Sequence, residues 1–307
     1  MIRATSCSSR LLLGFLVIAL LTLLAATAPL EALNARQLAD EVTETSDSQN
    51  SEKPVDTVTI GDHYVVLQVL PHDARAFTQG LTYFDGNLWE GTGLFTQSEL
   101  RRVDPNTGDI LQKHKLAGKY FGEGIAHFND ENGNARIIQI TWKSGVGWIY
   151  DATSFDILRE FHFATKTMEG WGITYNKEQK EFIVSDGSSH LFFWDRDSLQ
   201  EKRRIEVFAE IPSKSDPNTT KKQAMHELNE LEWHNGAVLA NVWYQDILLK
   251  IDPITGIVQH IYNFENLYKD RADSADCFNG ISVTDKEDEL WVTGKQWPIM
   301  FRIKLLL

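Results

Sequence analysis

The chain has 307 residues, and 42% of them are hydrophobic, which is enough to bury a substantial core in one large domain or two small ones. A formal net charge of −13 argues against nucleic acid as a partner, because binding to phosphates requires an excess of Lys and Arg. Aromatic residues make up 11% of the chain, and most of the nine tryptophans fall at the ends of short apolar runs, a pattern that suits stacked β-sheets.

The N-terminal segment has the features of an exported protein. An apolar run over residues 11–28 follows two arginines and ends in Ala26-Thr27-Ala28, the small-x-small pattern that signal peptidase recognises. We expect residues 1–28 to be a signal peptide, or a membrane anchor if Pro29 prevents cleavage after this tripeptide. The expected location is the secretory pathway or the cell exterior, with membrane contact only through such an anchor.

The segment after the predicted signal is polar and acidic, and we expect residues 29–56 to form a flexible linker. Of the two cysteines, Cys7 lies inside the predicted signal, so the exported chain would hold only Cys277 and no internal disulfide. Packing must therefore stabilise the domain that we expect over residues 57–307. Asn218-Thr219-Thr220 is an N-glycosylation sequon in a polar loop, consistent with secretion in a eukaryote.

From residue 57 onward the chain repeats one pattern of short strands. Each repeat opens with an apolar strand, continues after a turn with a second one such as Asn87-Leu88-Trp89, and then has a third in which an apolar residue stands beside a charged one. Five repeats open at Gly80-Leu81-Thr82, Gly124-Ile125-Ala126, Gly172-Ile173-Thr174, Glu230-Leu231-Glu232 and Gly280-Ile281-Ser282. These openings are 44 to 58 residues apart, which is typical of a four-stranded propeller blade. The repeats therefore predict an all-β fold, a five-bladed β-propeller.

The two ends of the repeat region are expected to close the ring. The fifth repeat runs out at Leu307 after its third strand, so its blade lacks an outer strand. The β-type run over residues 64–69, which precedes the first repeat, can supply that strand and leaves no long free edge. The insertion around residues 212–224 is predicted to be an exposed loop. A doubly wound α/β fold is the alternative, but no long segment with helical periodicity separates the strands.

One heptapeptide, Tyr120-Phe121-Gly122-Glu123-Gly124-Ile125-Ala126, places a carboxylate between two glycines and behind two aromatic residues. The glycines allow a sharp turn and a close approach by another molecule, and the aromatic side chains can exclude water from Glu123. A carboxyl group whose pKa is raised toward neutrality can both donate and accept a proton at physiological pH. A solvated loop glutamate is the alternative at this position. Four other carboxylates are rival candidates: Glu90, Glu169, Glu230 and Glu232.

Several other chemistries lack their motifs. His226-Glu227-Leu228-Asn229-Glu230 has Glu where a zinc protease needs its second His, and the nine histidines are scattered singly, so we expect no catalytic metal. The nucleophile elbow G-x-S-x-G and the phosphate-binding loop G-x-x-x-x-G-K-[ST] are absent from the sequence. Cys277 could act as a nucleophile, although a lone cysteine in a strand is usually a small buried apolar residue.

Ten short motifs occur in order between about residues 60 and 305. They are Phe77-Thr78-Gln79-Gly80-Leu81, Glu90-Gly91-Thr92-Gly93, Ser98-Glu99-Leu100-Arg101, Phe121-Gly122-Glu123-Gly124, Thr141-Trp142, Glu169-Gly170-Trp171-Gly172, Asn229-Glu230-Leu231-Glu232, Ala240-Asn241-Val242-Trp243, Phe278-Asn279-Gly280-Ile281 and Thr293-Gly294-Lys295-Gln296-Trp297-Pro298. In this order the sequence resembles the plant- and bacterial-type glutaminyl-peptide cyclotransferases. The resemblance implies a five-bladed propeller that converts the N-terminal glutamine of peptides and proteins into pyroglutamate with loss of ammonia, without a metal or other cofactor. Phe95-Thr96-Gln97 departs from the family's more usual Tyr-Gly, which bears on substrate preference.

The resemblance also implies roles for nine residues. Glu123 would be the catalytic acid and base, and Asn229 and Lys295 would be polar groups of the active site. The substrate pocket would be lined by Phe77, Gln79, Phe121, Trp142, Trp171 and Trp243. From the sequence pattern alone, the tryptophans could instead pack the blades, Lys295 could be a solvated turn lysine, and Asn229 could cap a turn.

An N-terminal glutamine contains both reacting groups of this cyclisation, the α-amine as nucleophile and the side-chain amide carbon as electrophile. The enzyme must keep the substrate curled, take a proton from the amine and return one to the departing nitrogen. One carboxyl group such as that of Glu123 can perform both transfers, and Lys295 and Asn229 are the candidate donors to the amide oxygen. A propeller that binds peptides without turnover and a metal-dependent propeller hydrolase remain as alternatives. We expect a monomer.

Overall fold

The computed structural model describes residues 60–61, 63–212 and 220–306. Within these ranges the chain forms the strands β1 to β23. No helix among the described residues is long and apolar enough to cross a membrane. The predicted signal (1–28), the predicted linker (29–56) and Asn218 of the sequon lie outside the described residues.

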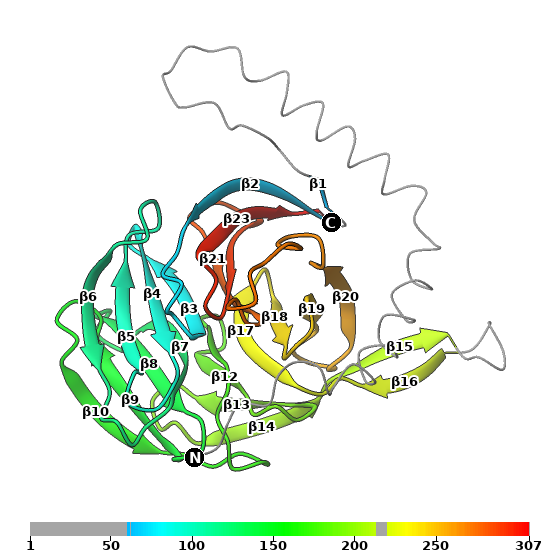
Figure 1. Cartoon of the computed structure of the whole chain (residues 1–307). Helices are drawn as coiled ribbons and strands as arrows, with labels where there is room; N and C mark the ends of the chain where they lie inside the picture. The colour runs from blue at the N-terminus through cyan, green and yellow to red at the C-terminus, as the bar shows by residue number, and fades with distance from the viewer. Residues whose placement is uncertain (1–59, 62, 213–219, 307) are drawn as a thin grey trace. The chain divides into compact units, whose positions relative to one another are not determined.

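Four of the five blades are antiparallel sheets of four consecutive strands (Figure 1). The first blade consists of β3 (Thr78–Phe84), β4 (Asn87–Thr92), β5 (Glu99–Val103) and β6 (Ile110–Lys115), and the second of β7 (Gly122–Asn129), β8 (Ala135–Thr141), β9 (Val146–Asp151) and β10 (Ile157–His162). The third blade consists of β11 (Ile173–Asn176), β12 (Glu181–Ser185), β13 (His190–Asp195) and β14 (Glu201–Glu206), and the fourth of β17 (Leu228–His234), β18 (Ala237–Val242), β19 (Ile247–Ile251) and β20 (Val258–Asn263).

The fifth blade combines strands from both ends of the described chain. Its first three strands are β21 (Phe278–Val283), β22 (Glu289–Gly294) and β23 (Ile299–Leu305). The fourth is β2 (Tyr64–Pro71), which lies along β23 in Figure 1 and pairs with it from Tyr64 opposite Leu305 to Pro71 opposite Ile299. The short strand β1 (Ile60–Gly61) extends the sheet beyond β2. Strand β2 thus takes the place that the sequence analysis assigned to residues 64–69.

The innermost strands form a closed ring. β3 contacts β7, β7 contacts β11, β11 contacts β17, β17 contacts β21, and β21 contacts β3. Glycine makes this approach possible, because a Cβ atom at Gly80 would lie 2.8 Å from the Cα of Gly124, and one at Gly124 would lie 2.7 Å from the backbone nitrogen of Ile173. The prediction of a five-bladed β-propeller is confirmed, and the crowding between inner strands explains the glycine that opens most repeats.

The position of a strand in its blade determines its pattern of burial. Inner strands such as β7 are buried along nearly their whole length, because both of their faces pack against neighbouring blades. Outer strands such as β6 and β14 alternate exposed and half-buried side chains, which is the period of a strand with one solvent-facing side. The core therefore lies between the blades and around the inner strands.

The insertion before the fourth blade differs from its prediction as an exposed loop. β15 (Phe208–Pro212) and β16 (Thr220–Ala224) pair in antiparallel register and form a separate two-stranded sheet (Figure 1). The Lys222 ammonium lies 4.0 Å from the centre of the Phe208 ring, a cation–π contact that links the two strands. The sequence of β16 is too polar to show the alternation of a half-buried strand, and for this reason the hairpin was not predicted.

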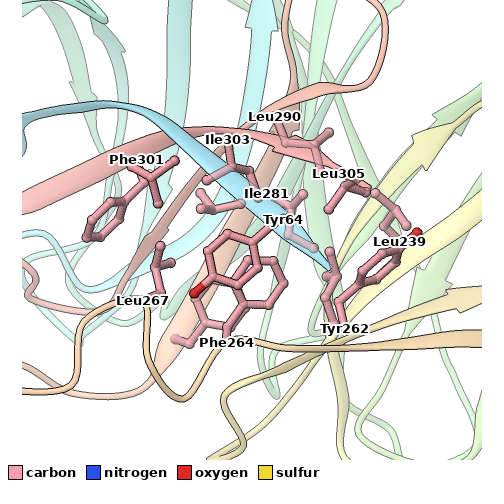
Figure 2. Close-up of a cluster of buried hydrophobic side chains, with 14 of the residues drawn as sticks. Tyr64, Leu239, Tyr262, Phe264, Leu267, Ile281, Leu290, Phe301, Ile303 and Leu305 are labelled. Atoms are coloured by element: carbon pink, nitrogen blue, oxygen red, sulfur yellow. The ribbon is translucent and has the colours of Figure 1, made fainter. Parts of the chain in front are cut away.

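A hydrophobic cluster holds the closing strand in place (Figure 2). The Tyr64 ring of β2 is buried and stacks on the Phe264 ring, with 4.4 Å between the ring centres. Figure 2 shows Ile303 and Leu305 of β23, together with Leu239 of β18, around this pair. The cluster therefore joins the fourth and fifth blades, and the burial of its apolar surface keeps the ring closed.

Two buried carboxyl groups on β17 connect the inner strands. One oxygen of Glu230 accepts a hydrogen bond from the backbone nitrogen of Leu81 at 3.3 Å, and the other accepts from that of Ile281 at 2.9 Å. Glu232 accepts from the backbone nitrogen of Val283 at 2.8 Å. Burial raises the pKa of Glu230 well above its ordinary value, and the nearby Glu232 raises it further. Burial also raises the pKa of Glu232 to about 7.

We predict that Tyr64→Ala lowers the free energy of unfolding by about 3–5 kcal/mol, because it removes a buried aromatic ring from the closing cluster. Val69→Ala is the matched control, since this side chain on the same strand is 56% exposed and its truncation should change stability by less than about 0.5 kcal/mol. Denaturant unfolding followed by tryptophan fluorescence measures both variants. Equal losses of stability would contradict a specific role of Tyr64 in closure.

The raised pKa of Glu232 should make stability depend on pH. The unfolded chain loses this proton near the ordinary pKa of 4.5, whereas the folded protein keeps it up to about pH 7, so stability falls as the pH rises between these values. Glu232→Gln can keep the hydrogen bonds to the backbone of Val283 and to the hydroxyl of Thr174, which lies 3.2 Å away. Because glutamine does not titrate, the loss of stability with rising pH should be smaller in this variant by roughly 3 kcal/mol. Denaturant unfolding at about pH 5 and about pH 8 measures how much the free energy of unfolding changes between these pH values. The prediction requires this change to be smaller in the variant than in the wild type.

Candidate active site

The candidate side chains occupy equivalent positions near the start of the inner strands. In four blades the ladder between the first two strands is interrupted at this position, so the residue there has no partner on the next strand. These residues are Gln79 of β3, Glu123 of β7, Asn229 of β17 and Asn279 of β21. In the third blade Trp171 takes the equivalent place, just before β11. The fold thus brings five side chains of four kinds to one end of the ring.

Glu123 is the one carboxylate among these five side chains, and only 4% of its surface is exposed. Gln79 donates a hydrogen bond to it, with 3.1 Å between Nε2 and Oε1. Burial raises the pKa of Glu123 well above its ordinary value, the positive charge of Lys295 lowers it in part, and the negative charge of Glu169 raises it again. Glu123 is therefore a desolvated carboxyl group and not the solvated loop glutamate that the sequence left as an alternative.

The charge of Lys295 acts on the same carboxyl group. It directly follows β22 and is 3% exposed, and its ammonium lies 5.0 Å from the centre of the Phe77 ring. Its backbone nitrogen donates to the carbonyl of Cys277 at 2.9 Å, which fixes the turn that carries it. Phe77 meets the ring of Phe121 edge to face, with 6.1 Å between ring centres. The lysine is thus a buried cation and not a solvated turn residue.

The predicted aromatic residues form two groups that one carboxylate connects. Phe121 contacts Trp142 with 5.5 Å between ring centres, and Trp171 contacts Trp243 edge to face with 5.4 Å. Glu169 joins the groups, because its Oε2 atom accepts hydrogen bonds from the indole nitrogens of Trp142 at 2.7 Å and Trp171 at 2.8 Å. The structure therefore places the predicted tryptophans together at one site.

Asn229 is brought to the site by the position of its strand. It is 2% exposed, and its backbone carbonyl accepts a hydrogen bond from the hydroxyl of Ser185 at 2.6 Å. Its side-chain oxygen is buried and has no hydrogen-bond partner among the described residues. No hydrogen bond within the described ranges joins the Asn229 side chain to Glu123 or Lys295. A buried acceptor without a hydrogen-bond donor requires an explanation, and one explanation is that a bound ligand supplies the donor.

The rival carboxylate Glu90 is committed to a buried ion pair. It accepts from the hydroxyl of Thr78 at 2.7 Å and lies 2.8 Å from Nε2 of His72. The Nδ1 atom of His72 faces the carbonyl of Trp297 at 2.6 Å, so both ring nitrogens face acceptors. Burial alone would lower the pKa of His72, but Glu90 and this carbonyl raise it above its ordinary value. Both contacts therefore favour the protonated form of the histidine, with Glu90 as its counter-ion.

Asn279 belongs to the same constellation and was missed by the sequence analysis. Its side-chain nitrogen donates to the carbonyl of Thr78 at 2.9 Å and lies 3.5 Å from the side-chain oxygen of Gln79. It thereby orients the amide that donates to Glu123. A signal was present in the sequence, because aligning the five repeat openings places Asn279 in the column that holds Glu123 and Asn229.

Cys277 is the remaining nucleophile candidate from the sequence. Burial raises the pKa of its thiol to about 11, so the thiol is protonated at neutral pH and is a poor nucleophile. As for metals, the described part of the chain contains no group of three or more His, Cys, Asp or Glu side chains arranged to hold an ion.

A separate cavity of about 740 Å³ lies at the opposite ends of the inner strands. It is lined by residues near the ends of β3, β7, β11 and β17, among them His127, Trp233 and Glu232. Glu123 and Lys295 do not line it, so the candidate site and this cavity lie at different ends of the ring.

Comparison with known proteins identifies relatives of this chain. The sequence profile of the family described as Glutamine cyclotransferase matches residues 37–305. A curated protein of Arabidopsis thaliana named Glutaminyl-peptide cyclotransferase is 32% identical over 245 residues, which cover 78% of this chain and 70% of that protein.

Solved structures include proteins of similar fold. The glutaminyl cyclase of Myxococcus xanthus matches with a TM-score of 0.67 and 28% sequence identity, over 79% of this chain and 96% of that chain. A PQQ-bound aldose sugar dehydrogenase from Streptomyces coelicolor matches with a TM-score of 0.50 at 11% identity, over 81% and 99% of the two chains, a likeness of fold alone. The resemblance indicated by the ten motifs is confirmed. The chain belongs to the glutamine cyclotransferase family.

Proposed function

We propose that the chain is a glutaminyl-peptide cyclotransferase, which closes the N-terminal glutamine of peptides and proteins into pyroglutamate with release of ammonia, and that Glu123 relays the proton. The observation that carries the proposal is the buried Glu123 carboxyl, which accepts a hydrogen bond from the amide of Gln79 and whose pKa is lowered in part by the charge of Lys295. The family and the Arabidopsis relative support the activity.

The reaction requires one proton to move from the attacking nitrogen to the departing one. The α-amine attacks the side-chain amide carbon and closes a five-membered ring, and the bond to the amide nitrogen breaks as that nitrogen takes a proton and leaves as ammonia. A carboxyl group with an ordinary pKa is already deprotonated at neutral pH and has no proton to donate, whereas the raised pKa of Glu123 favours both transfers. Glu123 ends the turnover in the protonation state in which it began, and no metal or other cofactor enters this scheme.

Negative charge grows on the amide oxygen while the ring closes. The Lys295 ammonium, buried beside Phe77, would donate a hydrogen bond to this oxygen. The side-chain amide of Asn229, on the inner strand of the fourth blade, would add a second donor. Because both groups are held in place before the reaction, they would stabilise this charge without first reorganising.

The aromatic side chains would select a curled glutamine. The rings of Phe77, Phe121, Trp142, Trp171 and Trp243 lie in mutual contact or are joined through one carboxylate. In this arrangement they would contact the methylenes of the substrate and exclude water from the reacting atoms. Binding energy from these contacts would hold the amine close to the amide carbon.

Location and assembly are part of the same proposal. Export is supported by the apolar run over residues 11–28 and by the sequon at Asn218, so the enzyme would act in the secretory pathway or outside the cell. The exposed apolar side chains Val69, Ile157 and Ile254 lie on three different blades, which supports a monomer.

Glu123→Gln should reduce kcat for ammonia release by about 10²–10⁴-fold, because an amide cannot exchange the proton. Glu131→Gln, in the exposed turn between β7 and β8, is the matched control and should keep the wild-type rate. A coupled ammonia assay on a short Gln-initiated peptide measures the rates, and circular dichroism checks the fold. The proposal is wrong if the wild-type protein releases no ammonia, and the relay is wrong if Glu123→Gln keeps full activity.

Lys295→Met should lower kcat by about 10²–10³-fold, because it removes a donor to the developing charge. It should also raise the pKa of Glu123, since the ammonium now lowers that pKa, so the pH–rate profile should move to higher pH. Lys113→Met, which removes a half-exposed ammonium 3.0 Å from Glu99, is the control. Steady-state kinetics across pH test the prediction, and a profile that does not move would contradict the coupling between Lys295 and Glu123.

A further inference from the structure

A single carboxylate oxygen links two tryptophans of the proposed pocket. Glu169 lies between β10 and β11, and its Oε2 atom accepts from the indole nitrogens of Trp142 at 2.7 Å and of Trp171 at 2.8 Å. Trp142 directly follows β8 of the second blade, and Trp171 precedes β11 of the third, so the bridge crosses the boundary between two blades. From the sequence, Glu169 was a rival candidate for the proton-transferring carboxylate.

We propose that Glu169 is a positioning residue of the active site, whose carboxylate fixes the indole rings of Trp142 and Trp171 relative to each other and so shapes the wall against which the substrate glutamine binds. This inference rests on the proposed function. The side chain is placed there as an acceptor and not as a proton donor, because both of its indole partners can only donate.

The remaining contacts of Glu169 make the bridge rigid. Its second oxygen, Oε1, lies 3.2 Å from the ammonium of Lys143, and the same ammonium lies 4.0 Å from the centre of the Trp142 ring. The ring of Trp171 meets Trp243 edge to face, so an indole plane fixed by Glu169 also fixes its neighbour. Hydrogen bonds to a charged acceptor are stronger than neutral ones, which suits a carboxylate better than an amide at this position.

The charge of Glu169 has a second effect that experiment can separate from the first. The charged groups that face Glu123 are Lys295, which lowers its pKa, and Glu169, which raises it. The charged groups that face Glu169 are Lys143 and Glu123. Removing the negative charge of Glu169 should therefore lower the pKa of Glu123, whether or not the indole rings stay in place.

Two variants divide these effects. Glu169→Gln keeps a carbonyl oxygen that can accept from both indoles and removes the charge. Glu169→Met keeps the length of the side chain and removes both. We expect kcat/KM on a short Gln-initiated peptide to fall by on the order of 10²-fold in Glu169→Met, because the pocket wall loses its geometry. In Glu169→Gln we expect a fall of less than about tenfold, with the pH–rate profile moved to lower pH, as the loss of one charge near Glu123 requires.

Glu160 offers a matched control, because it makes the same kind of bond away from the site. Glu160 lies on the outer strand β10, and its Oε2 atom accepts from the indole nitrogen of Trp148 at 3.0 Å. Glu160→Met should leave kcat, KM and the pH–rate profile of the wild type unchanged. A loss as large as that of Glu169→Met would show that any glutamate–indole bond matters to the fold, and would overturn the proposal.

A readout without catalysis distinguishes failure of this inference from failure of the proposed function. Indole N–H signals of Trp142 and Trp171 in ¹H–¹⁵N spectra should stay near their wild-type shifts in Glu169→Gln and move in Glu169→Met. Protein that shows this pattern but releases no ammonia contradicts the proposed function alone. Equal kcat/KM for Glu169→Met and wild type, or equal losses in the two variants, would overturn the positioning role.

If Glu169→Met does not fold, the wild type still decides: both N–H groups should exchange with solvent more slowly than an exposed indole.

Discussion

Crowding around the ring of inner strands is the constraint on which the rest of the structure depends. Gly80 and Gly124 have no space for a side chain, so neighbouring inner strands meet backbone to backbone. The ladder to the second strand is broken at the same point, and the residue before each of these glycines, Gln79 or Glu123, is left without a strand partner. In four of the five blades this position is thereby released from pairing and becomes available for chemistry.

The same crowding determines the charge state of Glu123. A lysine close to a carboxylate would ordinarily keep it ionised, yet burial is the larger influence here and holds the pKa of Glu123 well above its ordinary value despite Lys295. Glu230 is equally buried, but its two oxygens accept from the backbone nitrogens of Leu81 and Ile281. Burial alone therefore does not distinguish a reactive carboxyl from a structural one. The difference lies in whether backbone amides already occupy its oxygens.

Much of this arrangement could be predicted from the sequence, because the blades repeat and the fifth repeat visibly lacks an outer strand. The hairpin of β15 and β16 could not, since its polar residues show no alternation. The glycine and aromatic neighbours of Glu123 pointed to burial but left a solvated loop glutamate as the alternative. The bridge through Glu169 could not be predicted, because it depends on the directions of two indole N–H bonds from different blades. Asn279 could have been predicted, because aligning the five repeat openings places it at the position equivalent to Glu123.

The backbone repeats around the ring, but the side chains at its equivalent positions do not. These side chains are those of Gln79, Glu123, Trp171, Asn229 and Asn279. Two carboxylates at adjacent positions would raise each other's pKa and would have to share a proton, so that neither could act alone. Amides and an indole at the other four positions bring donors without a second titrating acid, and they leave one group to hold the proton. Five-fold repetition of the backbone thus supplies the geometry, and departure from that repetition in the side chains supplies the chemistry.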